Sequence, residues 1–180
     1  MVSLSIRPWL VGEALVHHGL TFRPITEDDH PFLFQVYAST REEELAIVPW
    51  SEEQKQAFLQ FQFMAQHTFY QDQFKSADFW VIEQAGTDIG RLYIDRRPDE
   101  IHIIDIALMP TYCDRGLGTA LLNTVLAAAQ ANSQPITIHV ERNNRALNLY
   151  RRLGFVQKGE ESVYHLMAWT PSNQNINLGD

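Results

Sequence analysis

Apolar residues recur at two different spacings along the chain, and each change of spacing predicts a new element. A short strand is predicted over Leu20–Arg23, followed by a helix that Thr26 caps and that ends before Arg41. Ser51 and Gln54 have the spacing of a capping box and predict the start of a second helix. Three- and four-residue spacing gives this second helix one apolar face, which we expect to lie in the core: Ala57, Phe58, Phe61, Met64 and Ala65.

The middle of the chain changes to extended runs. Apolar and β-branched residues fill Phe79–Glu83, Ile89–Asp95 and Ile101–Leu108, and turn residues separate these runs. Three strands of an antiparallel meander are therefore predicted. The third run is apolar except at His102 and Asp105, as expected of a central strand that is covered on both faces.

Two strand-and-helix units follow. A turn over 112–119 leads into the apolar helical pattern of Ala120–Ala129, and alternating residues from Ile136 to Val140 predict the next strand. A helix is then expected over Asn143–Leu153, with Gly154 ending it. Phe155–Val156 and Val163–Trp169 are predicted to be closing strands.

Composition and charge narrow the possible classes. The 180 residues suit one domain, which we place at 20–170 between an N-terminal extension, 1–19, and a tail, 171–180. A net charge of −8 disfavours a nucleic-acid partner. No segment has the length of a membrane span or the uniformity of a signal peptide, so we expect a cytoplasmic protein with no membrane partner. The single cysteine, Cys113, excludes a disulfide framework, and no histidines have ligand spacing, so no metal is expected.

The turn from Cys113 to Thr119 is the first segment whose spacing suggests chemistry. Its two glycines, Gly116 and Gly118, let a ligand approach the backbone closely, and the first amides of the following helix have no partner within the helix. Such a helix start suits phosphate oxygens. By itself the pattern is weak evidence, because tight turns also use glycine for geometry alone.

Two motifs at a fixed separation carry a family resemblance. Asp105-Ile-Ala-Leu-Met-Pro110 precedes the glycine turn, and Asn143-x-x-Ala-x-x-Leu-Tyr150-x-x-x-Gly-Phe155 follows it. Together they resemble the GNAT superfamily of N-acetyltransferases. The resemblance implies an α/β (α+β) fold with a mixed, mostly antiparallel sheet of six to seven strands, splayed at its centre and flanked by about four helices.

The resemblance also implies where acetyl-CoA binds. Its pantetheine would pair with the backbone of Ile106, Ala107 and Leu108, and Asn143 and Tyr150 would also contact the coenzyme. Its pyrophosphate would lie on the turn formed by Asp114, Arg115, Gly116, Leu117, Gly118 and Thr119. One departure is Cys113, where the family usually has Gln or Arg; a small packed residue is a more ordinary explanation than a nucleophilic thiol there.

Acetyl transfer to an amine needs a proton acceptor and a proton donor for the departing thiolate. By the resemblance, Tyr150 is the acid. His102 is the first candidate for the base, Glu100 the second because it lies two residues earlier, and Asp105 the third. His102 is equally compatible with a purely structural role in the sheet.

The acceptor is expected to be a small cationic primary amine. Acidic residues gather between 27 and 53, where they suit solvated helix faces and first turns more readily than an entrance for an amine. With Asp95, the aromatic residues Trp50, Phe61, Phe69, Tyr70 and Tyr93 suggest an acid-rimmed pocket. A protein N-terminus or lysine is an alternative acceptor. A silent acyl-CoA sensor and an interaction module are alternative functions on the same fold. A homodimer through the terminal strands or the N-terminal arm is also possible.

Overall fold

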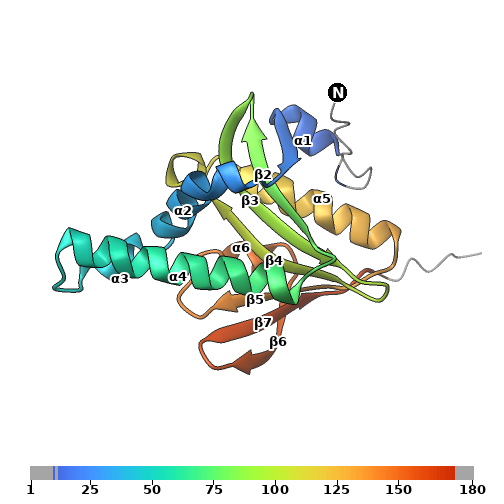
Figure 1. Cartoon of the computed structure of the whole chain (residues 1–180). Coiled ribbons are helices and arrows are strands. Elements are labelled where there is room, and N and C mark those ends of the chain that lie inside the picture. Colours follow the sequence, from blue (N-terminus) through green and yellow to red (C-terminus); the bar gives the residue numbers. More distant parts are fainter. Residues whose placement is uncertain (1–9, 11, 173–180) are drawn as a thin grey trace, which may run out of the picture.

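The computed structural model describes residues 10 and 12–172, in which seven strands form one sheet (Figure 1). The strands are β1 (Leu20–Pro24), β2 (Asp78–Gln84), β3 (Thr87–Arg96), β4 (Ile101–Leu108), β5 (Ile136–Glu141), β6 (Val156–Glu161) and β7 (Tyr164–Trp169). The helices are α1 (Glu13–His17), α2 (His30–Ser39), α3 (Glu42–Ala46), α4 (Glu52–Gln73), α5 (Leu117–Ala131) and α6 (Leu147–Arg152). Short 3₁₀ turns cover Glu27–Asp29 and Pro110–Tyr112.

The sheet is mixed, with the order β1-β2-β3-β4-β5-β7-β6. All neighbouring pairs are antiparallel except β4 and β5, which run parallel. This parallel pairing covers only Ile101–Ile103 of β4, whereas β4 stays paired to β3 as far as Leu108. The sheet therefore splays between β4 and β5, and the predicted fold class is confirmed. The six helices exceed the expected number because α1 and α3 are short helices that we did not predict.

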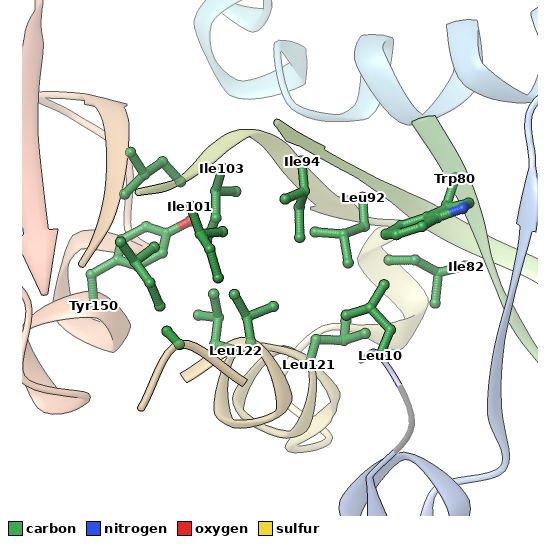
Figure 2. Close-up of a cluster of buried hydrophobic side chains, with 14 of the residues drawn as sticks. Leu10, Trp80, Ile82, Leu92, Ile94, Ile101, Ile103, Leu121, Leu122 and Tyr150 are labelled. Carbon is green, nitrogen blue, oxygen red and sulfur yellow. The ribbon is translucent and has the colours of Figure 1, made fainter. Parts of the chain in front are cut away.

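The two faces of the sheet have separate cores. On one face α1, α5 and α6 cover apolar residues of the strands, and Figure 2 shows Leu121 and Leu122 of α5 beneath the apolar side chains of β3 and β4. On the other face α2, α3 and α4 form a smaller core around Phe63, which is 1% exposed. Alternation along β3 divides its side chains between these cores, with Leu92 and Ile94 facing α5.

The buried face of α4 is not the one expected from the spacing. The helix starts as predicted, because Ser51 accepts from the Gln54 amide and the Gln54 side chain accepts from the Ser51 amide. However, Leu59 and Phe63 are its buried residues, whereas Phe58, Phe61 and Met64 are exposed. The prediction of a core face was wrong because α4 carries apolar residues on two sides and the sheet covers only one.

The helix α6 is shorter than predicted. Residues 142–146 form turns, and the Asn144 side chain accepts from the Ala146 amide at 2.8 Å. The helix therefore begins at Leu147 rather than at Asn143. This correction places Asn143 in an exposed turn at the C-terminal end of β5.

Part of the expected extension packs into the main core. Leu10 and Leu15 are 2% and 3% exposed, and α1 packs against α5. Residues 1–9, 11 and 173–180 lie outside the described part, so the extension and tail as wholes stay predictions. Within the described residues, every helix is too short or too polar to cross a bilayer.

Candidate functional site

The open edge of β4 is the centre of the site. Ile106 and Ala107 pair with Leu92 and Arg91 of β3 on one side, while the opposite side of this segment has left β5. Backbone amides and carbonyls on that side have the geometry to accept another extended chain. The residues Ile106, Ala107 and Leu108, predicted to contact the pantetheine, all lie on this edge.

The turn that follows β4 presents amides at the start of α5. Asp114 and Gly116 have φ values of 59° and 79°, which lie in the left-handed region, and Gly116 is the N-cap of α5. Leu117, Gly118 and Thr119 form the first turn of this helix, where amides have no acceptor within the helix. A Cβ at Gly118 would lie 3.4 Å from Leu149 Cδ2, so this glycine also keeps α5 close to α6. The turn fits phosphate oxygens.

Arginine side chains surround the same helix start. Arg115 lies over the Tyr112 ring, with its guanidinium carbon 5.2 Å from the ring centroid. Arg145 lies 3.5 Å from the Asp114 carboxylate, and Arg152 donates to Thr119 Oγ1 at 3.4 Å. The sequence analysis missed Arg145 and Arg152; their position in the second motif was the available signal. Cys113 Sγ lies 3.8 and 3.7 Å from the carbonyls of Leu108 and Met109, in a packed position.

Tyr150 approaches β4 from the α5 side of the sheet. The residue is 3% exposed, and its ring meets Phe155 edge-on at 5.5 Å. In Figure 2 the hydroxyl end of Tyr150 points toward Ile101 and Ile103 of β4. Burial, and then the negative charge of Asp105, raises the pKa of the Tyr150 phenol. The side chain therefore stays protonated at neutral pH and can act as a proton donor.

A buried ion pair occupies the other face of the sheet at the splay. Arg91 Nη2 lies 2.9 Å from Asp105 Oδ2 and also donates to Gln66 Oε1 of α4 at 3.1 Å. Arg91 is only 3% exposed, and Asp105 lies two residues beyond Ile103, the last residue of β4 that pairs with β5. Arg91 and Asp105, charged residues within two largely apolar strands, thus pair with each other. The sequence analysis did not predict this role for Arg91.

Phenol side chains surround this carboxylate. Burial raises the pKa of Tyr70, and the charge of Asp105 raises it further. Burial also raises the pKa of Tyr93 to about 12, and the rings of Tyr70 and Tyr93 meet edge-on at 6.2 Å. The pKa of Tyr164 is raised by burial and then by Glu141 and other acids, Asp105 among them. The charge of Asp105 therefore raises the pKa of tyrosines on both faces of the sheet.

His102 and Glu100 lie at the closed end of β4. His102 Nδ1 is 2.9 Å from Thr137 Oγ1, and this hydroxyl donates to Glu100 Oε2 at 3.0 Å. Glu100 precedes β4 and is also bonded to Arg97. His102 stacks on Phe74 at 5.9 Å and meets His139 at 5.7 Å. Burial, with a contribution from Arg97, lowers the pKa of His102 to about 4, so the ring is neutral at pH 7.

The surface formed by α3, the end of β5 and β6 is rich in acids. Arg41 donates to both carboxylate oxygens of Glu141, at 2.8 and 2.6 Å, and this contact holds the start of α3 against the end of β5. Nearby, Arg142 lies 3.1 Å from Glu160. The remaining exposed acids on this surface are Glu42, Glu43 and Glu44 of α3 and Glu161 of β6.

The expected aromatic rim does not form as one pocket. Phe61 and Phe69 are exposed on the outward side of α4, and Trp50 packs against Phe58. Asp95 is paired with Arg97 at 2.8 Å, near the closed end of β4. Of the expected set, only Tyr70 and Tyr93 lie near the splay. Among the described residues no cluster of three or more histidine, cysteine or acidic side chains could hold a metal ion.

Comparison with known proteins agrees with this geometry. Residues 75–157 match the family model for the acetyltransferase (GNAT) domain. No curated protein matches the sequence.

Solved structures resemble the whole fold at low identity. An N-acetyltransferase, PaiA, from Thermoplasma acidophilum in complex with coenzyme A has a TM-score of 0.61 at 17% identity, covering 84% of this chain and 98% of that one. A ribosomal L7/L12 alpha-N-protein acetyltransferase, also with coenzyme A, has a TM-score of 0.56 at 16% identity, covering 85% and 94%. The ribosomal-protein-S18-alanine N-acetyltransferase from Escherichia coli has a TM-score of 0.53 at 22% identity, covering 89% and 99%.

These likenesses confirm the fold, and the family model confirms the resemblance seen in the motifs. The splayed β4, the glycine turn and Tyr150 all lie inside the matched segment. Residues 75–157 therefore match an acetyltransferase (GNAT) domain, and the expectation of an acyltransferase is confirmed.

Proposed function

We propose that this protein transfers an acetyl group from acetyl-CoA directly to a small cationic primary amine. The observation that carries the proposal is the splay of β4 from β5 beside the arginine-ringed start of α5. The unpaired edge at 106–108 suits an extended pantetheine, and the amides of 114–119 suit a pyrophosphate. The proposal includes the cytoplasm as its location.

The two proton-transfer roles have candidates on opposite faces of the sheet. Tyr150 would donate its phenolic proton to the thiolate that leaves when the amine nitrogen attacks the thioester carbonyl carbon. Asp105 would hold the amine and accept its proton from the opposite face. This assignment favours Asp105 over His102 and Glu100, because Asp105 lies at the splay, whereas those two lie at the end of β4 where it is still paired with β5.

The choice of a cationic acceptor rests on charge. Acids outnumber bases at the entrance formed by α3, the end of β5 and β6, and its arginines Arg41 and Arg142 are already paired with Glu141 and Glu160. A negative potential raises the local concentration of an ammonium ion. A protein N-terminus carries the same charge, so the test must include both kinds of amine.

Calorimetric titration with acetyl-CoA tests the cofactor site without knowledge of the acceptor. We expect a Kd near the micromolar range for the native protein and no binding by Gly118→Trp. Arg152→Glu should weaken binding at least tenfold, whereas Arg142→Glu, its matched control away from the turn, should not. Absence of binding by the native protein would refute the proposal.

Thiol release in the presence of amines tests the chemistry. We expect turnover with a small diamine and little with a peptide N-terminus or a lysine peptide. Tyr150→Phe should lower kcat at least 100-fold with unchanged acetyl-CoA affinity, and Tyr93→Phe serves as the matched change on the other face. Binding without release for every amine would indicate a sensor, and turnover with the peptides alone would reassign the acceptor.

A further inference from the structure

The outward side of α4 carries an apolar surface that no part of the described chain covers. We define the outer face of α4 as the side chains that line it: Phe58, Phe61, Met64, Ala65, Thr68 and Phe69. Phe61 is 72% exposed and Phe69 is 56% exposed. A monomer rarely leaves so many large apolar side chains together, and such a patch usually marks an interaction site. The opposite side of the same helix is already packed, through Leu59 and Phe63.

The outer face has both protruding and recessed parts. A shallow groove runs along it, lined by Phe61, Met64, Ala65, Thr68, Phe69, Asp72 and Gln73. Ala65 and Thr68 are the small side chains of this set, and Phe61 lies one turn before them. The positions 58, 61, 65 and 68 follow the alternating three- and four-residue spacing of a helix–helix seam.

We propose that a second copy of this chain covers the outer face, with α4 packed antiparallel against α4 of the partner about a two-fold axis near Met64 and Ala65. In that arrangement Phe61 enters the recess over the partner's Ala65 and Thr68, and the partner's Phe61 does the same in return. A two-fold interface requires such a self-complementary surface.

The charges at the two ends of α4 select the antiparallel orientation. Glu53 lies at the first turn of the helix and Lys75 lies just beyond its last residue, and both are exposed. Centring the axis near residue 64 brings Glu53 opposite Lys75 of the partner. A parallel pairing would instead bring like charges together.

The available area suits a dimer of standard kind. Full burial of an aromatic side chain covers roughly 150–250 Å², so the exposed parts of the large apolar residues on this face amount to about 400 Å² per protomer. With an apolar share of about 60%, an interface built on both copies would bury roughly 1,300 Å². This exceeds the ~1,000 Å² that a specific interface needs.

The position of α4 leaves room for a partner. Figure 1 shows that the N-terminal half of α4, with α3, extends past the edge of the sheet. The side chains of α4 that reach the site, Gln66 and Tyr70, lie on the side facing the sheet. Pairing through the outer face therefore leaves the proposed acceptor entrance open. This interface differs from the terminal strands and the N-terminal arm considered from the sequence.

Sedimentation equilibrium of the full chain is the first test. We expect a mass twice the 20.7 kDa of one chain at micromolar concentration. Phe61→Glu should give a monomer with an unchanged circular dichroism spectrum, because Phe61 is exposed. Gln56→Glu, an exposed position seven residues before the sheet-facing Phe63 and so on the side of α4 opposite the outer face, should leave the dimer intact. A monomeric native protein, or a dimer that survives Phe61→Glu, would overturn the proposal.

Two further variants test the orientation. Glu53→Lys and Lys75→Glu should each weaken the dimer, and the two together should restore it. In a Cys113→Ser background, Ala65→Cys should form a disulfide-linked dimer on mild oxidation, while Gln56→Cys should not. Failure of the charge swap to restore the dimer, or equal cross-linking at both positions, would refute the antiparallel pairing.

Discussion

The buried pair of Arg91 and Asp105 allows a quantitative prediction about stability. Arg91 is 3% exposed, and the side chain of Asp105 is 15% exposed, so the pair is largely removed from water. Asp105→Asn removes the negative charge and leaves the guanidinium with only neutral partners, Gln66 among them. Loss of one partner of a buried pair costs about 3–5 kcal/mol. This is a large part of the ~5–15 kcal/mol that holds a domain folded.

Urea unfolding and differential scanning calorimetry at pH 7 measure this cost. For a chain of this size the loss corresponds to a fall in Tm of roughly 6–20 °C. Glu160→Gln is the matched control, because it breaks the half-exposed pair with Arg142 and should cost at most about 1 kcal/mol. The double variant Arg91→Met with Asp105→Leu should be more stable than Asp105→Asn alone, because it leaves no unpaired charge. If Asp105→Asn and Glu160→Gln cost the same, the reasoning about burial is wrong.

Three further predictions follow from single contacts. Gly90→Ala should lower the free energy of unfolding in urea by about 1–3 kcal/mol and weaken acetyl-CoA binding, because the added Cβ would lie 2.3 Å from the Ala107 carbonyl oxygen on β4. Gly159→Ala is the control, because a Cβ there meets nothing within 4 Å. Equal losses of stability in the two variants would contradict this prediction. Tyr93→Phe should leave the free energy of unfolding unchanged or raise it by about 1 kcal/mol, because the Tyr93 hydroxyl is buried without a hydrogen-bond partner. A loss of more than about 1 kcal/mol would show that the hydroxyl is hydrogen-bonded. For His102 the folded pKa of about 4 lies below the unfolded value of 6.5, so its contribution is complete above pH 6.5 and is lost as the pH falls toward 4. His102→Asn should therefore lose about 3 kcal/mol less between pH 7 and 4 than the native protein, and it should keep the native pH profile of kcat/KM between pH 6 and 9.

Local patterns predicted most of the elements because their signals lie within a few residues. The meander of β2, β3 and β4 follows from extended runs separated by turns, and the start of α4 follows from Ser51 and Gln54. The turn before α5 was predicted from Gly116 and Gly118, and the left-handed φ of Gly116 explains why glycine stands there. Each of these features depends on neighbours in the sequence.

The wrong or missing predictions concern which elements pack against each other. α4 has an apolar residue on almost every side, so spacing alone could not tell whether Phe61 or Phe63 faces the sheet. Likewise, Arg41 and Glu141 are 100 residues apart, and nothing in the pattern pairs them. Tertiary packing decides both questions, and it also separates the expected aromatic pocket into an inner pair and an exposed outer face.

A one-residue irregularity explains how a charged site is built on an otherwise apolar strand. In a regular β4 the side chains of Ile101, Ile103 and Asp105 would share a face, which would place a carboxylate in the α5 core. The register instead shifts between Tyr93 and Ile94 of β3, so that Ile94 pairs with Ile103 and Tyr93 pairs with Asp105. Ile104 is the extra residue of this bulge.

The bulge therefore turns Asp105 to the face where Arg91 and Gln66 receive it. It also comes just beyond Ile103, the last residue of β4 that pairs with β5. The splay that opens the backbone and the carboxylate proposed to meet the amine thus arise at one point of the strand. A strand without this bulge could keep the open edge for the coenzyme, but it would carry no acid on the acceptor side.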